Sequence, residues 1–407
     1  MQLKKLAAAL SGPFSDDALG ALVAHMQRET VMDAEIAYLA ECLAQSGTCL
    51  ELQGKGLTAD IASTGGPTSL STLVCPLYLC ALGCVVPKLG VPGRPAGGID
   101  VLAQVPGFRF RLSGEEVEDA LCRSRYVHFL ASDDFAPLDA VLFAFRQRTG
   151  RLAVPSLVIA SILSKKIAAD VRLAGLDVRV APHCNFGTNW DNARHNAEQF
   201  CRVARLLRRT GLCVLTDARR PLQPFVGRGE SLVALSQCLR YEPPSEWLSG
   251  HVDACYAIVR ALLASSIVHT NSTRPTVSDL RRVFSAQLAA QGTTMSCFHE
   301  RVAAVADAPR EGIMATREGF LEIDLHRLRT EIVCLQERTR SGDDPFPDPF
   351  GVVLLKQPSS FVYKGDLLAY VRSRLHDPRE IAPRVQEALA IKPLPVGHAS
   401  LEVISHG

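Results

Sequence analysis

The stretch ADIASTGGPTSLSTL, residues 59–73, carries the pattern that decides the fold. A short apolar segment runs into two glycines, and hydroxyl side chains then lead into a long apolar segment. This order predicts a strand, a tight turn and the start of a buried helix. Backbone N–H groups in such a turn, with a helix N-terminus behind it, bind anions. The candidate anion ligands are Ser63, Thr64, Gly65, Gly66, Ser71 and Thr72.

Length and composition place the chain among ordinary globular proteins. The 407 residues have room for two or three domains, and 47% of them are hydrophobic and 21% charged. A net charge of +2 gives no electrostatic footprint for nucleic acid, so we expect no nucleic-acid partner. The 13 cysteines are odd in number and form no C-x-x-C pair, and no secretory signal begins the sequence. We therefore expect a reduced, cytoplasmic protein.

The most apolar run, residues 71–87, is shorter than the roughly 20 residues that a membrane span needs. It also contains Pro76 and Gly83, and no basic flank marks an orientation. We predict a buried helix that leads into a strand, and no membrane partner.

The rest of the chain alternates between two patterns. Strand-like runs at residues 125–131, 175–181 and 211–217 are separated by helical patterns, and residues 15–47 read as two helices with Ser15 as the first N-cap. This alternation predicts an α/β fold with a mainly parallel sheet. The last region carries the short strands GVVLLK, KGDLLAYV and SLEVI after an irregular loop at residues 341–351, which predicts a small α+β end domain.

A second glycine-rich stretch, PKLGVPGRPAGGIDVLAQVPGF, supports an anion site. Lys88 ends a predicted strand and Arg94 lies in the loop that follows. An α/β sheet places anion chemistry at this end of its strands. The alternative is a surface loop with two basic residues that bind nothing.

A third stretch brings a cation and a hydroxyl together. Ser161 and Lys165 are four residues apart in PSLVIASILSKKIA and so share one helix face, and Arg146 in the preceding segment can reach them. These groups suit a planar ligand whose carbonyl oxygens gain negative charge during a reaction. An ordinary amphipathic helix would give the same spacing.

These stretches, in this order, resemble the pyrimidine nucleoside phosphorylases, the family that includes thymidine phosphorylase. The resemblance rests on STGG at residues 63–66, GGID.L..VPGF at 97–108, FAFR at 143–146, IASILSKK at 159–166 and LTD at 215–217, with G..L and V.KGD.LA after residue 350. It implies a helical base-binding domain at residues 1–62 and 141–171, an α/β domain that binds phosphate and sugar at 63–140 and 172–330, and a C-terminal α+β domain at 331–407. It also implies a homodimer.

The resemblance assigns a base site. The family's arginine and its serine–lysine pair match Arg146, Ser161 and Lys165, and Phe143 stands where the family has a tyrosine. We therefore expect a nucleoside, nucleotide or base as one ligand and an anionic co-substrate as the other.

The phosphate machinery departs from the family pattern. Family members carry Lys-His directly before STGG, where the lysine binds phosphate and the histidine protonates the leaving base; Ile61 and Ala62 stand there here. The family's phosphate-binding serine and threonine become Gly90 and Gly98. Each lost charge-assisted hydrogen bond costs about 1.5–3 kcal/mol, and a lost general acid costs about 10²–10⁴ in rate. We therefore expect poor phosphorolysis by the usual route.

Two further positions depart as well. The family's phenylalanine-bearing loop is replaced by APHCNFGTNWD at residues 181–191, which makes His183 a candidate acid or simply an exposed loop histidine. The family's potassium-site carboxylate is out of register at Glu230, and we assign no metal ligand.

A fainter resemblance links the same loops to anthranilate phosphoribosyltransferases, which bind phosphoribosyl pyrophosphate with a Gly-Gly loop, Asn-x-Ser-Thr and Lys-His-Gly-Asn-Arg. Three functions follow as hypotheses. The first is a pentosyltransferase with an altered phosphate site. The second is a phosphoribosyltransferase that uses phosphoribosyl pyrophosphate, with Mg²⁺ as cofactor. The third is a catalytically inactive binding paralogue.

Overall fold

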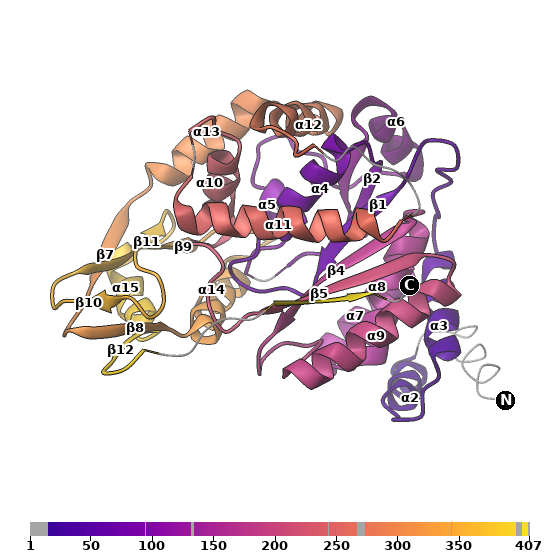
Figure 1. Ribbon diagram of the computed structural model, residues 1–407, viewed down its shortest axis with the longest axis horizontal. Helices are drawn as coiled ribbons and strands as arrows, with labels where there is room; N and C mark the ends of the chain where they lie inside the picture. Colours follow the sequence, from indigo (N-terminus) through magenta and orange to yellow (C-terminus); the bar gives the residue numbers. More distant parts are fainter. Residues whose placement is uncertain are drawn as a thin grey trace.

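The computed structural model of the protein describes residues 15–405 except 94, 132–133, 243, 267–272, 343 and 396–400. It is a mixed α/β structure with a mainly parallel central sheet, which confirms the predicted fold class. Helices cover both faces of this sheet, and a second group of strands lies at one end of the molecule (Figure 1).

The central sheet has the strand order β3-β2-β1-β4-β5-β13. Parallel pairing joins β1 to β4, β4 to β5 and β2 to β3, and an isolated parallel bridge from Thr58 to Val85 sets β2 beside β1. The parallel strands are β1 (Ala59–Ser63), β2 (Val86–Gly90), β3 (Tyr126–Leu130), β4 (Leu173–Val180) and β5 (Thr210–Asp217). Every residue of β3 and β4 is buried, as expected for strands that are covered on both faces.

Two helical layers cover the sheet. On one face α4 packs on β1, and α11 packs on α4 and β4; on the other face α9 packs on β4 and β5, and α3 packs on α8 and α9. The helices of these layers and their neighbours are α2 (Asp16–Met26), α3 (Asp33–Gln45), α4 (Ser71–Ala81), α5 (Gly98–Leu102), α6 (Gly114–Ser124), α7 (Pro137–Arg148), α8 (Pro155–Ala168), α9 (Trp190–Leu206), α10 (Arg228–Cys238), α11 (Glu246–Ala264), α12 (Val277–Ala290) and α13 (Met295–Ala306).

Local sequence fixes several helix ends. Ser15 caps α2 as predicted, because its Oγ accepts a hydrogen bond from the Ala18 N–H at 3.2 Å. Pro155 occupies the first turn of α8, where its fixed φ favours a helix and no N–H is missed. Residues 71–87 form α4 and lead into β2, which confirms a buried helix followed by a strand.

The end group of strands forms two antiparallel sheets around its own apolar core. Its elements are β6 (Phe225–Val226), β7 (Arg310–Met314), β8 (Gly319–Ile323), α14 (Leu325–Thr339), β9 (Phe350–Leu354), β10 (Phe361–Val362), β11 (Leu367–Ser373), α15 (Pro378–Gln386) and β12 (Leu389–Lys392). Two features correct the sequence prediction. The strand in SLEVI, β13 (Leu401–Ser405), leaves this group and pairs antiparallel with β5, and β6, β7 and β8 join the group from before residue 331. A strand's own sequence does not specify its partner, so neither feature could be predicted.

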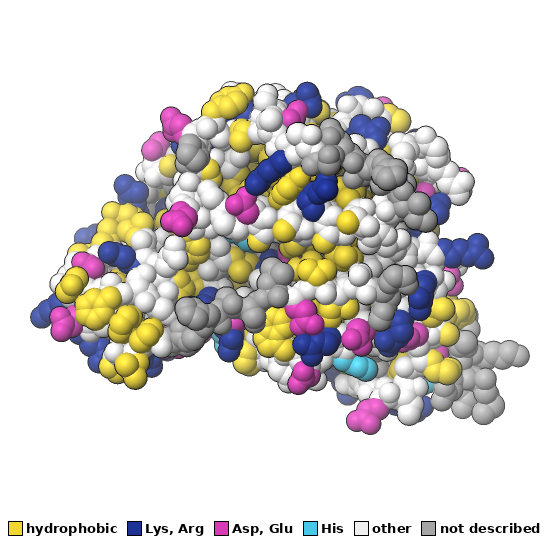
Figure 2. Space-filling view, in the orientation of Figure 1, with side chains coloured by type: hydrophobic (Ala, Val, Ile, Leu, Met, Phe, Trp, Pro, Cys, Tyr) yellow, Lys and Arg dark blue, Asp and Glu magenta, His cyan; other side chains and the backbone are white. Residues whose placement is uncertain are grey.

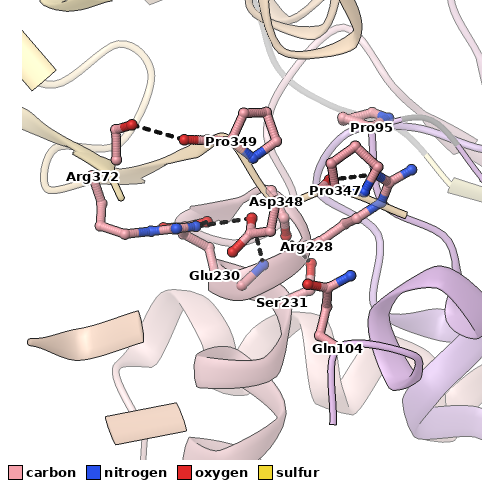
Figure 3. A network of polar contacts seen from close by, with 12 residues as sticks. Pro95, Gln104, Arg228, Glu230, Ser231, Pro347, Asp348, Pro349 and Arg372 are labelled. Atoms are coloured by element: carbon pink, nitrogen blue, oxygen red, sulfur yellow. Dashed lines mark hydrogen bonds and ion pairs between the residues drawn. The ribbon is translucent and has the colours of Figure 1, made fainter. Parts of the chain in front are cut away.

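A buried polar network joins the end group to the central layers (Figure 3). Arg372 of β11 donates two hydrogen bonds of 2.7 Å to Glu230 of α10 and one of 3.0 Å to Asp348. Burial disfavours a charged Arg372, but the two carboxylates outweigh it and raise the pKa of the guanidinium. Nearby, Arg228 donates to Asp100 of α5 at 2.8 Å. Glu230, which sequence analysis left without a metal role, is thus an ion-pair partner here.

The surface mixes both signs of charge on the face drawn in Figure 2, with hydrophobic side chains gathered over the end group. Exposed members of that group include Phe361 and Tyr363. Within the described residues, no helix combines the length and the hydrophobicity that crossing a membrane would require.

Candidate functional site

The glycine turn follows β1 directly. Gly65 and Gly66 have φ values of +107° and +118°, which residues with a Cβ rarely adopt. The Thr64 N–H donates to the Asp177 carbonyl at 3.0 Å, and the Thr64 Oγ1 accepts from the Arg179 N–H at 2.9 Å. The turn is therefore fastened to the end of β4.

The hydroxyl groups after the turn are engaged by the same two residues of β4. Ser71 Oγ donates to Asp177 Oδ2 at 2.5 Å, and Arg179 donates to Ser69 Oγ at 2.7 Å. Arg179 also pairs with the Asp177 carboxylate, and both side chains are buried. Asp177 and Arg179 are site residues that sequence analysis missed. Their signal is the LDVRV segment, since two charges in a buried strand must find partners.

The remaining predicted anion ligands occupy different settings. Ser63 and Thr72 are half-buried, and Ser63 Oγ accepts from the Gly65 N–H at 3.3 Å. Arg94 lies outside the described residues. His251 Nε2 accepts from the Leu70 N–H at 2.9 Å, and His251 and Trp247 line part of an open hollow of about 480 Å³.

Lys88 lies within β2 rather than at its end, and its side chain is only 4% exposed. Its Nζ donates to Asp60 Oδ1 at 2.7 Å and to the Ile61 carbonyl at 2.6 Å. Lys166 of α8 pairs with the other Asp60 oxygen. Burial opposes ionisation of Asp60, but the ammonium groups of Lys166 and Lys88 outweigh it and hold the pKa of the carboxyl at about 2. Two cations thus share one buried carboxylate.

The base side centres on Lys165. Its Nζ pairs with Asp139 of α7 and donates to the Ser161 carbonyl at 2.8 Å and to Ser161 Oγ at 3.0 Å. The structure therefore brings Ser161 and Lys165 together on one face of α8, as their spacing predicts. Asp139 is a further residue that sequence analysis missed, because it lies in another helix.

Arg146 lies beside this group and holds the connection between α7 and α8. It is 2% exposed and donates to the carbonyls of Arg151 at 3.3 Å and Leu152 at 2.7 Å. Burial lowers the pKa of the Arg146 guanidinium to about 10, against the opposing effect of the Asp139 carboxylate. Phe143 is half-buried on the same helix. A ligand can accept hydrogen bonds from Arg146 only if the guanidinium gives up its bonds to these two carbonyls.

His183, the candidate acid, lies against the end group. Its ring stacks on that of His326 in α14, with centroids 4.6 Å apart. Partial burial lowers the pKa of His183, and the nearby His326 and Arg329 side chains add to this effect.

Comparison with known proteins finds relatives along most of the chain. Pyrimidine-nucleoside phosphorylase of Geobacillus stearothermophilus is 24% identical over 403 residues, which cover 95% of this chain and 90% of the relative. The enzyme of that name from Staphylococcus epidermidis is 24% identical over 370 residues, or 88% and 85% of the two chains. Human thymidine phosphorylase is 28% identical over 263 residues, which cover 60% of this chain and 54% of the human enzyme. The resemblance to pyrimidine nucleoside phosphorylases is confirmed.

Solved structures give a looser match. Anthranilate phosphoribosyltransferase from Thermus thermophilus aligns with 74% of this chain and 98% of its own, at 16% identity and a TM-score of 0.47. The Saccharomyces cerevisiae enzyme in complex with PRPP and Mg aligns over 71% of this chain and 84% of its own, at 12% identity and a TM-score of 0.45. No family model matches the chain.

Residues 61 and 62, which sequence analysis matches to the family's Lys-His, have a structural use in this chain. Ile61 is fully buried, and a methyl group added at Gly175 of β4 would lie 2.6 Å from its Cγ1. Its carbonyl anchors Lys88, and Ala62 is half-buried beside it. These two residues pack the sheet and supply no acid.

Proposed function

We propose that this protein is a pentosyltransferase that makes or breaks the glycosidic bond of a pyrimidine-like base, with an altered phosphate site. The observation that carries the proposal is the similarity to pyrimidine-nucleoside phosphorylase across 95% of the chain. The division into a helical, an α/β and a C-terminal domain at the predicted boundaries, with the end-group strands reassigned as above, is part of this proposal.

The base side supplies the charges that such a reaction needs. A departing pyrimidine gains negative charge on its carbonyl oxygens, and fixed cations stabilise that charge best where water is excluded. Lys165, Ser161 and Arg146 are all buried and lie on α7 and α8, which pack against the central layers. Asp139 and Ser161 hold the Lys165 ammonium in place, and a ligand would exchange with one of its contacts to Ser161.

The anion side supports a co-substrate that is bound differently from orthophosphate in the relatives. Ile61 and Ala62 carry no charge, while Lys88 brings a cation from the neighbouring strand β2 to the Ile61 carbonyl. A cationic group on a buried strand beside a glycine turn suits a phosphate or pyrophosphate group.

A substrate panel tests the proposal. The protein is incubated with pyrimidine nucleosides and nucleotides plus phosphate, and separately with bases plus phosphoribosyl pyrophosphate and Mg²⁺, and new species are separated by chromatography. We expect a new glycoside or a released base in at least one arm. Failure of every arm, with no base binding by calorimetry, would exclude the proposal.

A matched pair of lysine variants locates the base site. Lys165→Ala should weaken pyrimidine binding at least tenfold, because a charged hydrogen bond is lost. Lys356→Ala, which removes a half-exposed lysine paired with Asp366 in the end group, should leave binding unchanged. Equal affinities in the two variants would contradict the assigned base site.

An inactive binding paralogue is the second candidate. It is favoured by the absence of an acid at residues 61–62 and by the way Lys165, Arg179 and Lys88 are paired with neighbouring carboxylates. This alternative predicts ligand binding without turnover in every arm of the panel.

A further inference from the structure

His128, a buried histidine of β3, lies beside the two glycines that sequence analysis singled out in the second loop. A methyl group added at Gly90 would lie 3.1 Å from His128 Nε2, and one added at Gly98 would lie 2.3 Å from Cε1 and 3.2 Å from Nε2. The imidazole therefore occupies the space into which side chains at residues 90 and 98 would project. Neither position can gain a side chain unless the ring moves.

One nitrogen of the His128 ring lies beside a phenol. Tyr126 Oη is 3.4 Å from Nδ1, and either atom can be the donor. Burial and the nearby Lys88 ammonium lower the pKa of His128 well below 6.5, so the ring is neutral. With Tyr126 as the donor, a neutral ring carries its hydrogen on Nε2 and can donate from there.

No hydrogen bond joins Nε2 to another of the described residues, and the His128 side chain is 2% exposed. The backbone of His128 is held on both sides by Gln291, which accepts from the His128 N–H at 2.9 Å and donates to its carbonyl at 2.8 Å. The position of the ring is therefore fixed by its backbone, and Nε2 is directed at Gly90 and Gly98.

Lys88 lies next to His128 and completes a pair of donors. The two residues are directly paired in the parallel strands β2 and β3, so their side chains leave the same face of the sheet. Two of the three Lys88 hydrogens go to Asp60 and the Ile61 carbonyl, which leaves one for a further acceptor. Asp60, Lys88 and Lys166 together carry one negative and two positive charges, a net buried charge of +1.

We propose that His128 Nε2–H joins the Lys88 ammonium in binding the phosphate or pyrophosphate group of the co-substrate, where side chains at residues 61, 62, 90 and 98 supply no ligand. This inference rests on the proposed function, because it concerns the anion side of the same site. The absence of side chains at Gly90 and Gly98 leaves room for the ring. His128 thus adds a donor from β3 beside the lysine of β2.

Three variants test His128 by isothermal calorimetry with inorganic phosphate and with pyrophosphate. His128→Leu fills the space without a donor and should weaken anion binding about tenfold or more. His128→Gln keeps an N–H donor of similar reach and should retain more affinity than His128→Leu. His299→Gln, at an exposed histidine of α13, should bind as the wild type does. Thermal unfolding shows whether each variant is folded.

The outcomes separate this inference from the proposed function. If the wild type binds an anion and folded His128→Leu binds it equally well, or if the wild type binds neither anion, the inference is wrong, whatever the substrate panel shows. If His128→Leu loses anion binding and the panel yields no turnover, the inference stands and the pentosyltransferase function fails.

Discussion

The base side and the anion side of the site are built from contacts of different range. On the base side Ser161 and Lys165 meet within one helix, α8. On the anion side Asp60, Lys88 and His128 come from three neighbouring strands of the sheet. In the proposed function, the arrangement within one helix binds the base and the arrangement across three strands binds the anion. Under that proposal, the two ligands depend on separate parts of the fold.

Removing the Asp60 carboxylate, which Lys88 and Lys166 share, should have the largest effect. Asp60→Asn leaves the ammonium groups of Lys88 and Lys166 buried without a counter-charge, and we expect the free energy of unfolding to fall by about 3–5 kcal/mol. Asp119→Asn breaks an exposed pair with Arg123 and should change it by less than about 1 kcal/mol. Urea denaturation measures both. Equal losses would show that the buried cluster is not a stabilising unit.

The same carboxylate predicts a dependence of stability on pH. Its pKa falls from 3.8 to about 2 in the folded protein, so its contribution is complete above about pH 4 and is lost as the pH falls towards 2. The shift corresponds to about 2 kcal/mol. Unfolding of the wild type and of Asp60→Asn between pH 5 and pH 2 measures it. The difference between the two proteins should shrink by that amount, and a constant difference would contradict the assigned ion pairs.

The close contact between the His128 ring and Gly98 of α5 predicts the next largest effect on stability. Gly98→Ala places a methyl group 2.3 Å from His128 Cε1 and should destabilise the protein by about 1–3 kcal/mol, although alanine favours a helix. Gly250→Ala in α11 meets nothing within 4 Å and should be neutral or stabilising by up to about 1 kcal/mol. Adding His128→Ala to Gly98→Ala should remove the clash. A penalty for Gly98→Ala that is the same in both backgrounds would refute this packing.

Removing His183, the histidine of the loop at residues 181–191, should have the smallest effect on ligand binding and turnover. His183→Ala removes a ring that stacks on His326, and we expect pyrimidine affinity and any turnover to change by less than about twofold, because its contacts lie on the end group. A rate loss of about a hundredfold or more, the range for a general acid, would instead make His183 catalytic.

Sequence alone predicted what depends on neighbours in the chain. The Ser161–Lys165 contact, the Ser15 cap and the turn at Gly65 and Gly66 follow from spacing and residue type. The pairing of Lys88 with Asp60 could not be predicted, because the two residues lie 28 positions apart on different strands. His128 gave no sequence signal, since one histidine in an apolar strand is an ordinary core residue until its neighbours are known.

The partner of the strand in SLEVI was missed for a similar reason. Its alternating pattern fits any sheet edge, and the edge at β5 is specified only by the assembled fold.

The central claim is that two separate groups of residues hold the base and the anion. Calorimetric titration of thymine and of pyrophosphate into the wild type, Lys165→Ala and His128→Leu tests it in one set of measurements. We predict that Lys165→Ala loses thymine affinity at least tenfold and keeps pyrophosphate affinity, while His128→Leu does the reverse. Parallel losses of both ligands in both variants, or no loss in either, would contradict the account.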